Sequence, residues 1–355
     1  MIKWETIRAD VLKPKPTDES ALGFGKIFTD HMFFMRYDEG QGWHDARIQP
    51  YQEFSLNPAA MVLHYGQAIF EGLKAYCNTD GGIQLFRPEQ NMARFNRSAE
   101  RLCIPAIDEA SVLDALKALV RVDADWIPRG EGTSLYIRPT GIAVDPGLGV
   151  RVANSYYFFI IMSPVGSYYS GGLKPTKILV ENEYVRAVRG GMGFAKAAGN
   201  YACSLIADHT AKKFGCDQVL WLDGVERKYI EEVGAMNVFF KIGGELITPP
   251  LAGSILGGIT RDSIIQLSHK NGLTVREEPL SIDGVLAAQK DGTLEEVFGS
   301  GTAAVIAPVG TLVYKDTEYC VGDGGMGPCA LSLFEELTGI QKGILPDSMG
   351  WIQQI

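Results

Sequence analysis

The sequence predicts an α+β fold in two domains. Its 355 residues are enough for roughly two domains, each with its own core. Both halves contain short apolar runs bounded by glycine turns, typical of strands, and longer segments with helical apolar spacing. A stretch rich in Gly, Ser and Pro at residues 166–176 separates the halves. We therefore expect an N-terminal α/β domain over residues 1–165, a linker over 166–176, and a C-terminal domain over 177–355.

In the N-terminal half, proline and mixed charge at residues 1–20 predict an extended arm. Apolar and aromatic residues at 23–35 suit a strand, and Gly81-Gly82 predicts a hairpin turn between strands 68–76 and 83–86. Apolar residues at three- and four-residue steps predict two helices, of which the first starts at a proline. The helices are expected at 88–102 and 108–126, and further strands at 134–138 and 155–162. The last of these is almost wholly apolar, as expected of a strand covered on both faces.

In the C-terminal half, Gly215 is placed to end a helix over residues 200–214. Asn271-Gly272 closes a second expected helix at 260–269, and a third follows Pro328. Asp-Gly and Gly-Gly turns separate the expected strands of this half. These strands are predicted at 177–180, 218–222, 229–232, 237–240, 245–248 and 296–298, followed by the apolar segment 299–308.

Composition and charge exclude several classes of partner. The net charge is -9, from 42 acidic and 33 basic residues, so the surface should repel nucleic acid and anionic lipid. No apolar run approaches the ~20 residues of a membrane span, and the N-terminus does not resemble a targeting segment, so we expect a cytoplasmic protein. The six cysteines form no Cys-x-x-Cys pair and are expected to be reduced, and the five histidines do not have metal-ligand spacing. We therefore expect no metal site.

Residues 190–204 contain the first chemical signal, a lysine flanked by glycines and alanines just before a predicted helix. Glycine lets the backbone turn sharply and approach a ligand closely. A lysine surrounded by small residues has little water around its ammonium, and desolvation favours the neutral amine that can attack a carbonyl carbon. Lys196 is therefore a candidate Schiff-base lysine.

Residues 229–261 contain the second signal. Glu232 closes a predicted strand, and Gly257-Gly258 precedes a predicted helix. The backbone N–H groups of such a helix start form a natural phosphate cradle. An amine, an anion site and a carboxylate are what pyridoxal 5'-phosphate (PLP) requires for its aldehyde, its phosphate and its ring nitrogen.

The pattern Glu-x-Gly-x-x-Asn-Val-Phe, Leu-x-Thr and Leu-x-Gly-Ile-x-Arg over residues 232–261 resembles the class IV aminotransferase signature of fold-type-IV PLP enzymes. Further blocks resemble the branched-chain-amino-acid aminotransferases in particular, from about residue 20 to the C-terminus. These blocks are Phe24–Met32, Leu63–Gly72, Leu85–Pro88, Asn91–Arg94, Ser134–Pro139 and Gly299–Ala303. The resemblance implies a two-domain fold like that of D-amino-acid aminotransferase.

The resemblance also implies roles for cofactor-binding residues. Lys196 would bond the PLP aldehyde and then move the proton between substrate and cofactor, and Tyr201 would hydrogen-bond the phenolic oxygen. Glu232 would pair with the pyridine nitrogen. The phosphate would be held by a cation with forked donors and by backbone amides. The residues expected to hold the phosphate are Arg94, Ile259 and Thr260, and Thr302 is expected to be a further cofactor contact.

For the substrate, the resemblance implies that Tyr65 and the Thr302-Ala303 turn receive the α-carboxylate. An aromatic pocket would favour Leu, Ile and Val, since each buried CH₂ contributes about 0.8 kcal/mol. The residues expected to line this pocket are Phe24, Phe70, Tyr136 and Tyr168. Arg138 would take the distal carboxylate of glutamate or 2-oxoglutarate, the second substrate pair. Residues 148–150 would reach into a partner subunit's site, which implies a homodimer.

Two departures from the family pattern are visible. Residues 304–307 are Ala-Val-Ile-Ala, where some members have a redox-sensitive Cys-x-x-Cys, and Ala235 stands where relatives can have threonine. The alternatives within the fold are a D-amino-acid aminotransferase and an aminodeoxychorismate lyase, against which the aromatic blocks and Arg138 argue. A cofactor-free binding protein or a nucleotide-dependent dehydrogenase is a third alternative, although no Gly-x-Gly-x-x-Gly follows a strand.

Overall fold

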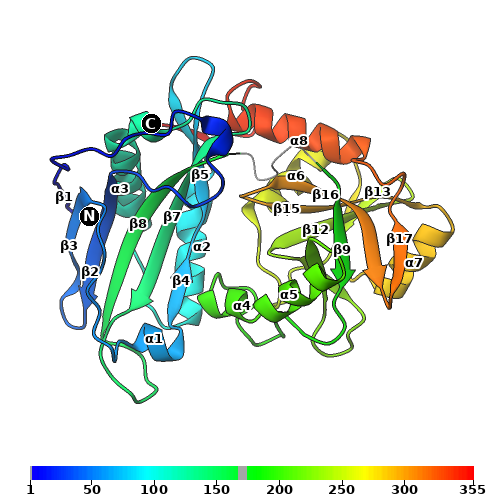
Figure 1. Ribbon diagram of the computed structural model, residues 1–355, viewed down its shortest axis with the longest axis horizontal. Helices are drawn as coiled ribbons and strands as arrows, with labels where there is room; N and C mark the ends of the chain where they lie inside the picture. Colours follow the sequence, from blue (N-terminus) through cyan, green and yellow to red (C-terminus); the bar gives the residue numbers. More distant parts are fainter. Residues whose placement is uncertain (1, 167–173) are drawn as a thin grey trace. The chain divides into compact units, whose positions relative to one another are not determined.

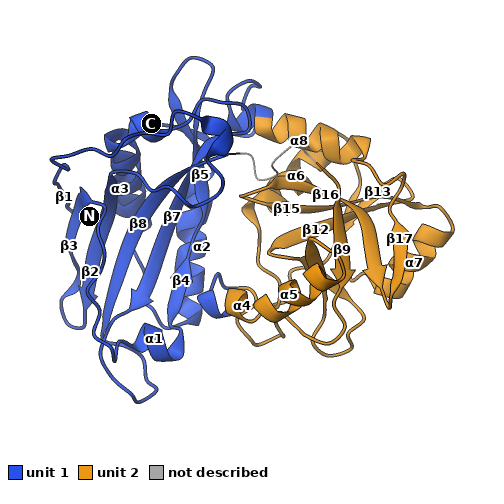
Figure 2. Ribbon diagram, in the orientation of Figure 1, with its two compact units in different colours: residues 1–168, 195–199, 339–355 blue, residues 169–194, 200–338 orange. Residues whose placement is uncertain are grey.

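The computed structural model describes residues 2–166 and 174–355. The chain forms two compact units, coloured separately in Figure 2. Unit 1 comprises Met1–Tyr168, Ala195–Gly199 and Gly339–Ile355, and unit 2 comprises Tyr169–Phe194 and Asn200–Thr338. Each unit combines helices with one large sheet, so the predicted α+β class is confirmed.

The strands and helices follow one another along the chain as labelled in Figure 1. In unit 1 they are β1 (Glu5–Thr6), η1 (Glu19–Ala21), β2 (His31–Asp38), β3 (Gly42–Pro50), α1 (Met61–Tyr65), β4 (Ala68–Phe70), β5 (Leu73–Cys77), β6 (Ile83–Phe86), α2 (Pro88–Arg101), α3 (Glu109–Val122), η2 (Ala124–Trp126), β7 (Ser134–Ala143), β8 (Ser155–Val165) and β18 (Ile352–Gln354). In unit 2 they are β9 (Thr176–Val180), α5 (Leu205–Lys213), β10 (Gln218–Leu222), β11 (Ile230–Val233), β12 (Met236–Ile242), β13 (Glu245–Thr248), α6 (Ile259–Lys270), β14 (Val275–Glu277), α7 (Ile282–Lys290), β15 (Leu294–Gly301), β16 (Val305–Tyr314) and β17 (Thr317–Cys320). Two helices pass from one unit to the other, α4 (Ala198–Ala202) and α8 (Pro328–Gln341).

The sheet of unit 1 has the strand order β1-β3-β2-β8-β7-β5-β6-β18, and β4 pairs with β7 beside this path. All pairs are antiparallel except β1 with β3. Helices α2 and α3 cover one face of this sheet (Figure 1). Phe95 of α2, which is fully buried, meets Phe158 of β8 edge to face with ring centroids 5.1 Å apart. The helices predicted at 88–102 and 108–126 are thus confirmed, and they are held by burial of one apolar stripe each.

Three expectations for unit 1 need correction. The strand expected over 23–35 begins only at His31. The strand expected over 68–76 is interrupted at Glu71-Gly72, where the Glu71 carboxylate turns into the interior, and forms β4 and β5. In β8, buried residues alternate with half-buried ones from Tyr156 to Met162, so its two faces are not equally covered. Apolar composition alone did not distinguish a half-buried face from a buried one.

The sheet of unit 2 has the order β11-β10-β9-β16-β15-β12-β13-β14, with β17 paired to β16. An additional pairing of β11 with β12 joins two strands that are separated along this path, so six strands form a closed ring. Phe239 of β12 stacks on Phe298 of β15, with centroids 5.2 Å apart. Closure places Glu232 of β11 directly beside Asn237 of β12.

Most predicted elements of unit 2 are confirmed, including the left-handed Gly215 and Gly272 after their helices. The helix expected over 200–214 is divided at Cys203-Ser204 into α4 and α5. Helix α7 was not predicted. Only Ile282, Val285, Leu286 and Ala288 of its nine residues are buried, and this short stripe gives a weak periodic signal.

The units are not the two continuous segments that the sequence suggests. Residues 195–199 lie in unit 1 because their backbone is bonded there: Phe70 N–H donates to Lys196 C=O at 3.1 Å, and Lys196 N–H donates to Ser98 Oγ at 2.9 Å. The C-terminal strand β18 lies in unit 1 because it pairs with β6. Most of the expected linker at 166–176 lies outside the described residues.

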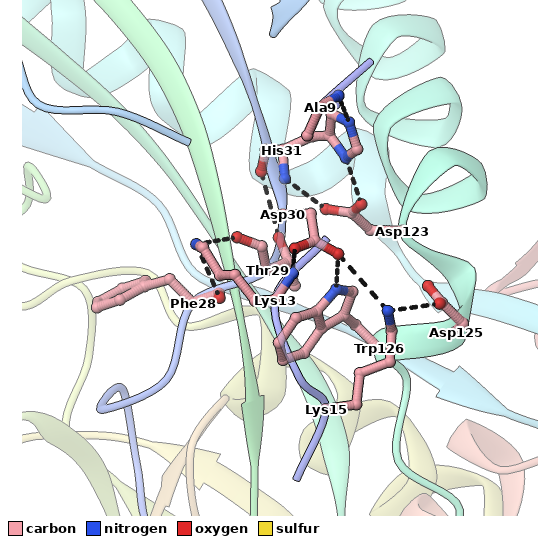
Figure 3. A network of polar contacts seen from close by, with 10 residues as sticks. All are labelled: Ala9, Lys13, Lys15, Phe28, Thr29, Asp30, His31, Asp123, Asp125 and Trp126. Atoms are coloured by element: carbon pink, nitrogen blue, oxygen red, sulfur yellow. Dashed lines mark hydrogen bonds and ion pairs between the residues drawn. The ribbon is translucent and has the colours of Figure 1, made fainter. Parts of the chain in front are cut away.

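The N-terminal arm is extended, as predicted, and polar contacts bind it to unit 1 (Figure 3). Ala9 N–H donates to His31 Nε2 at 2.9 Å, and His31 Nδ1 lies 2.6 Å from Asp123 Oδ1. Lys13 N–H donates to Asp30 Oδ1 at 2.7 Å. Since Nε2 accepts a hydrogen bond from Ala9, Nδ1 carries the ring proton and donates it to Asp123. Because both ring nitrogens are used in contacts within the protein, the buried His31 is a structural residue.

Within the described ranges 2–166 and 174–355, no helix is both long and apolar enough to cross a membrane. Over the same residues, no group of three or more His, Cys, Asp or Glu side chains could hold a metal ion.

Candidate active site

Lys196 lies in the turn before α4, between two buried alanines, Ala195 and Ala197. Its backbone is fixed on both sides, since its N–H bonds Ser98 of α2 and its C=O accepts from Phe70 of β4. An isolated bridge between Ala197 and Ile69 extends this contact with β4. The lysine predicted from its glycine-rich segment is therefore held on a rigid backbone and is itself half-buried.

The Lys196 amine belongs to a group of aromatic and cationic side chains in unit 1. Its Nζ lies 5.0 Å from the centroid of the Phe70 ring, and the Arg138 guanidinium lies 4.5 Å from the same centroid. Arg138 Nη2 donates to the Tyr136 hydroxyl at 3.1 Å, and Tyr136 meets Phe24 edge to face at 4.9 Å. Four residues predicted to contact the substrate, Phe24, Phe70, Tyr136 and Arg138, are thus brought together with the lysine.

Next to this group lies a buried ion pair. Arg94 Nε and Nη2 donate to the two oxygens of Glu71, at 2.6 and 2.8 Å. Glu71 is completely buried and Arg94 is 4% exposed. Although burial opposes ionisation, the pKa of Glu71 lies below its ordinary value because Arg94, then Lys196 and Asn91, stabilise the carboxylate. Arg94 therefore lies beside the lysine group and is held in one orientation.

In unit 2, Glu232 is the centre of a second group. Its Oε1 accepts the Leu256 N–H at 2.9 Å, and its Oε2 lies 3.1 Å from Arg186 Nε. The side chain is 4% exposed. These contacts stabilise the ionised carboxylate in a place where water is scarce. Glu232 can therefore act as a fixed negative charge.

Helix α6 begins next to this carboxylate. Asn237 Nδ2 donates to Leu256 C=O at 2.9 Å, and a Cβ added to Gly258 would lie 2.0 Å from Asn237 Oδ1. Only glycine fits against Asn237 at this helix start. The following residues, Ile259 and Thr260, are buried and form the first turn. Their amides point along the helix axis toward its N-terminal end, where an anion binds favourably.

The strand register extends the Glu232 group. Glu232 pairs with Asn237, and Asn237 pairs with Ser300 of β15, so the three residues form one row across three strands. The predicted Thr302-Ala303 turn follows immediately after β15 and is half-buried. The Thr302-Ala303 turn therefore follows the strand that pairs with β12, and β12 also pairs with the strand that carries Glu232. Tyr201, also half-buried, lies in α4.

The two remaining predicted substrate residues are Tyr65 and Tyr168. The Tyr65 hydroxyl, at the end of α1, donates to the Leu148 C=O. This bond connects Tyr65 to the loop that was expected to reach a partner subunit. Tyr168 lies outside the described residues.

The residues present fit PLP by their donor chemistry. Unit 1 provides an amine beside a buried arginine, and unit 2 provides a buried carboxylate hydrogen-bonded to the segment that starts a helix. The close approach of Asn237 to Gly258 leaves no room for a side chain at the helix start. Gly258 itself has no side chain to cover the backbone amides of this helix start, where an anion binds favourably.

Several residues of these groups were not singled out from the sequence. Glu71 and Asn237 lie inside the recognised sequence blocks but had no assigned role, and their positions in those blocks were the available signal. Ser98 and Arg186 gave no signal in the sequence. They contact Lys196 and Glu232 only through the fold.

The chain is similar to known proteins over almost its whole length. A branched-chain-amino-acid aminotransferase 2 from Bacillus subtilis (strain 168) is 57% identical over 354 residues, covering 99% of this chain and 97% of that protein. A crystal structure of the Escherichia coli branched-chain amino acid aminotransferase is 29% identical, with a TM-score of 0.75, and covers 92% of this chain and 99% of that one.

A crystal structure of the branched-chain amino acid aminotransferase from Thermobaculum terrenum in its PLP form is 24% identical, with a TM-score of 0.75, and shares the fold over 92% of this chain and 98% of that one. The family model for class IV aminotransferases matches residues 68–312, which include Phe70, Lys196 and Glu232. Enzymes of that family use PLP. The fold, the site and these matches together show that the chain belongs to the class IV aminotransferase family.

Proposed function

We propose that the chain is a branched-chain-amino-acid transaminase that moves the amino group of L-leucine, L-isoleucine or L-valine to 2-oxoglutarate. The products are the branched-chain 2-oxo acids and L-glutamate. Relatives with 57% and 56% identity over nearly the whole chain have this activity in their names, which supports the proposal.

PLP, when bound, would accept the amino group and withdraw electrons from the substrate Cα. Lys196 would be the amine that binds the cofactor's aldehyde and the base that carries the proton from the substrate Cα. Glu232, whose carboxylate is contacted by Leu256 N–H and Arg186, would be the acidic partner of the ring nitrogen. Arg94 and the amides of Ile259 and Thr260 would hold the phosphate.

The observation that carries this proposal is that the Lys196 amine and the Arg138 guanidinium both lie over the Phe70 ring. The ring, together with Phe24 and Tyr136, offers an apolar surface next to the reacting amine for a branched side chain. Arg138 adds one cation at that surface, which would bind the distal carboxylate of glutamate. One pocket can then accept two unlike substrates in turn.

Exposed apolar side chains support a homodimer. Leu148 and Val150 are 73% and 83% exposed in a loop that is held by the Tyr65 hydroxyl and by an Arg151–Asp145 ion pair of 2.6 Å. A loop that is apolar and yet fixed is suited to a partner surface, and a second copy would cover it. Light scattering should give twice the chain mass of 38.7 kDa.

The catalytic assignment is tested by Lys196→Ala. Without the amine there is no covalent link to the aldehyde and no base for the Cα proton, so we expect leucine turnover to fall by at least about 10⁴-fold. Steady-state rates and the absorption spectrum of the purified protein check this. Turnover of leucine by the variant at the wild-type rate would rule out the proposal.

The substrate assignment is tested by Arg138→Met with a panel of substrates. Loss of the cation should raise KM for glutamate and 2-oxoglutarate about 10- to 100-fold, as expected for one charged hydrogen bond. The KM for leucine should change much less. Preference for D-amino acids or for aminodeoxychorismate in the wild-type panel would favour the alternative class IV enzymes.

A further inference from the structure

We propose that Glu71 is a positioning residue that fixes the Arg94 guanidinium for phosphate binding and balances the charges of Arg94 and Lys196. The inference rests on the proposed function, because it concerns residues that would hold PLP. It gives a role to a carboxylate for which the transamination chemistry has no direct use.

Glu71 is committed entirely to contacts inside the protein. Its Oε1 accepts from Arg94 Nε, and its Oε2 accepts from Arg94 Nη2 at 2.8 Å, Asn91 Nδ2 at 2.8 Å and Gly72 N–H at 3.1 Å. With no exposed surface and four donors around it, the carboxylate cannot contact a substrate. It acts through the residues that it binds.

The hydrogen bonds between Glu71 and Arg94 are bidentate, so they fix the orientation of the guanidinium as well as its distance from the carboxylate. Glu71 uses the Nε–Nη2 edge of the guanidinium, so the plane of the group and the direction of Nη1 are fixed. Asn91 and Arg94 lie one turn apart on α2, and Asn91 also donates to Gly72 C=O at 3.2 Å. Helix α2 and the β4–β5 connection are therefore locked together at the arginine.

Lys196 is attached to the same two elements. Its C=O accepts from Phe70, the residue before Glu71, and its N–H donates to Ser98 of α2. The Glu71 carboxylate is also stabilised electrostatically by Lys196. Glu71 thus supplies one negative charge to Arg94 and Lys196, and its loss would leave these two cations without that charge.

The test compares wild type with Glu71→Gln, using cofactor-free protein titrated with PLP and, separately, with inorganic phosphate. Gln has nearly the same shape but presents an NH₂ group to one of the Arg94 donors. Because a charged hydrogen bond contributes about 1.5–3 kcal/mol, we expect both dissociation constants to rise about 10- to 100-fold. The pH midpoint of the absorption band of bound PLP should move to lower pH, because cationic forms near Lys196 lose a favourable charge. A purely structural role would not move this midpoint.

Glu296→Gln is the matched control. Glu296 is also buried, but it accepts the backbone N–H groups of Cys329 and Ala330 at the start of α8. Its variant should leave both dissociation constants and the midpoint at wild-type values. Equal changes in the two variants would overturn the proposal.

Unchanged PLP and phosphate affinity in folded Glu71→Gln, with an unshifted midpoint, would also overturn it. If that variant does not fold, Asn91→Leu removes one donor to Glu71 and should weaken PLP binding in the same direction, about 3- to 10-fold. An unchanged constant there would refute the inference. Wild-type protein that takes up no PLP would refute the proposed function itself, so the two failures are distinguishable.

Discussion

In unit 1, Arg94 and Glu71 form a two-pronged pair at 2.6 and 2.8 Å, whereas in unit 2 Arg186 Nε approaches Glu232 at a single distance of 3.1 Å. All four side chains are buried. In unit 1 the proposed cofactor ligand is the arginine and the carboxylate holds it. In unit 2 the proposed ligand is the carboxylate and the arginine holds it.

The difference follows from the charge that each member would meet. A phosphate needs a fixed cation, and a protonated ring nitrogen needs a fixed anion. A buried ion pair contributes little net stability because desolvation offsets the attraction, whereas removal of one partner is costly. Each pair is therefore better explained by the placement of a charge than by stabilisation of the fold.

The largest effect should come from Glu232→Gln, which removes the ligand charge of unit 2. Loss of the negative charge that would face the ring nitrogen of PLP should lower kcat about 10²- to 10³-fold, which leucine turnover measures. Glu231→Gln, the same change at the neighbouring residue, should have much less effect, because Glu231 bonds Ser254 instead. A similar fall in kcat in both variants would show that Glu232 is not the carboxylate that contacts the cofactor.

Two glycines permit a second comparison between the units. A Cβ at Gly72 would lie 2.0 Å from the Tyr136 hydroxyl, and a Cβ at Gly258 would lie 2.0 Å from Asn237 Oδ1. We expect Gly72→Ala mainly to raise KM for leucine and Gly258→Ala mainly to weaken PLP binding. Since overpacking costs about 1–3 kcal/mol, each effect should be about 5- to 150-fold.

Steady-state kinetics and PLP titration of both alanine variants separate these outcomes. Gly215→Ala serves as a control, since a Cβ there meets no atom within 4 Å and the residue only follows α5. It should reduce stability through its left-handed φ of 67° without a selective effect on KM or on PLP affinity. If Gly72→Ala changed only PLP affinity, the assignment of Tyr136 to the substrate pocket would fail.

The smallest effects concern stability against pH. The pKa of Glu71 lies below its ordinary value of 4.5, although burial opposes this, because Arg94 favours the charged form. Burial raises the pKa of Glu231 above 4.5. Glu71 therefore stabilises the protein above about pH 4.5 and loses this contribution as the pH falls through its folded pKa. Glu231 contributes below about pH 4.5 and loses its contribution as the pH rises through its folded pKa.

Urea unfolding of cofactor-free protein between about pH 2 and pH 8 tests these opposite signs. Relative to wild type, Glu71→Gln should be most destabilised at pH 8 and less so in acid. Glu231→Gln should gain stability relative to wild type as the pH rises. The same pH trend in both variants would show that the two carboxylates are not in opposite environments.

Local sequence signals predicted much of the fold. Gly215 and Pro88 marked helix ends correctly. Lys196, Arg94 and Glu232 are candidate site residues because they lie in recognisable blocks. The partners of these residues were not found. Glu71 is 23 residues from Arg94 in sequence, and no local pattern connects a strand break to a helix face.

The sequence by itself determined the α+β class, most helix and strand positions and the family, because turns, caps and apolar periods act over a few residues. The tertiary structure decided the pairings of β12 with β15 and of β9 with β16, which complete the ring of six strands, the return of residues 195–199 to unit 1, and both arginine–glutamate pairs. These features depend on hydrogen-bond register and on side-chain packing between distant segments. Such contacts are selected by the geometry of the whole fold and leave no periodic signal in either segment alone.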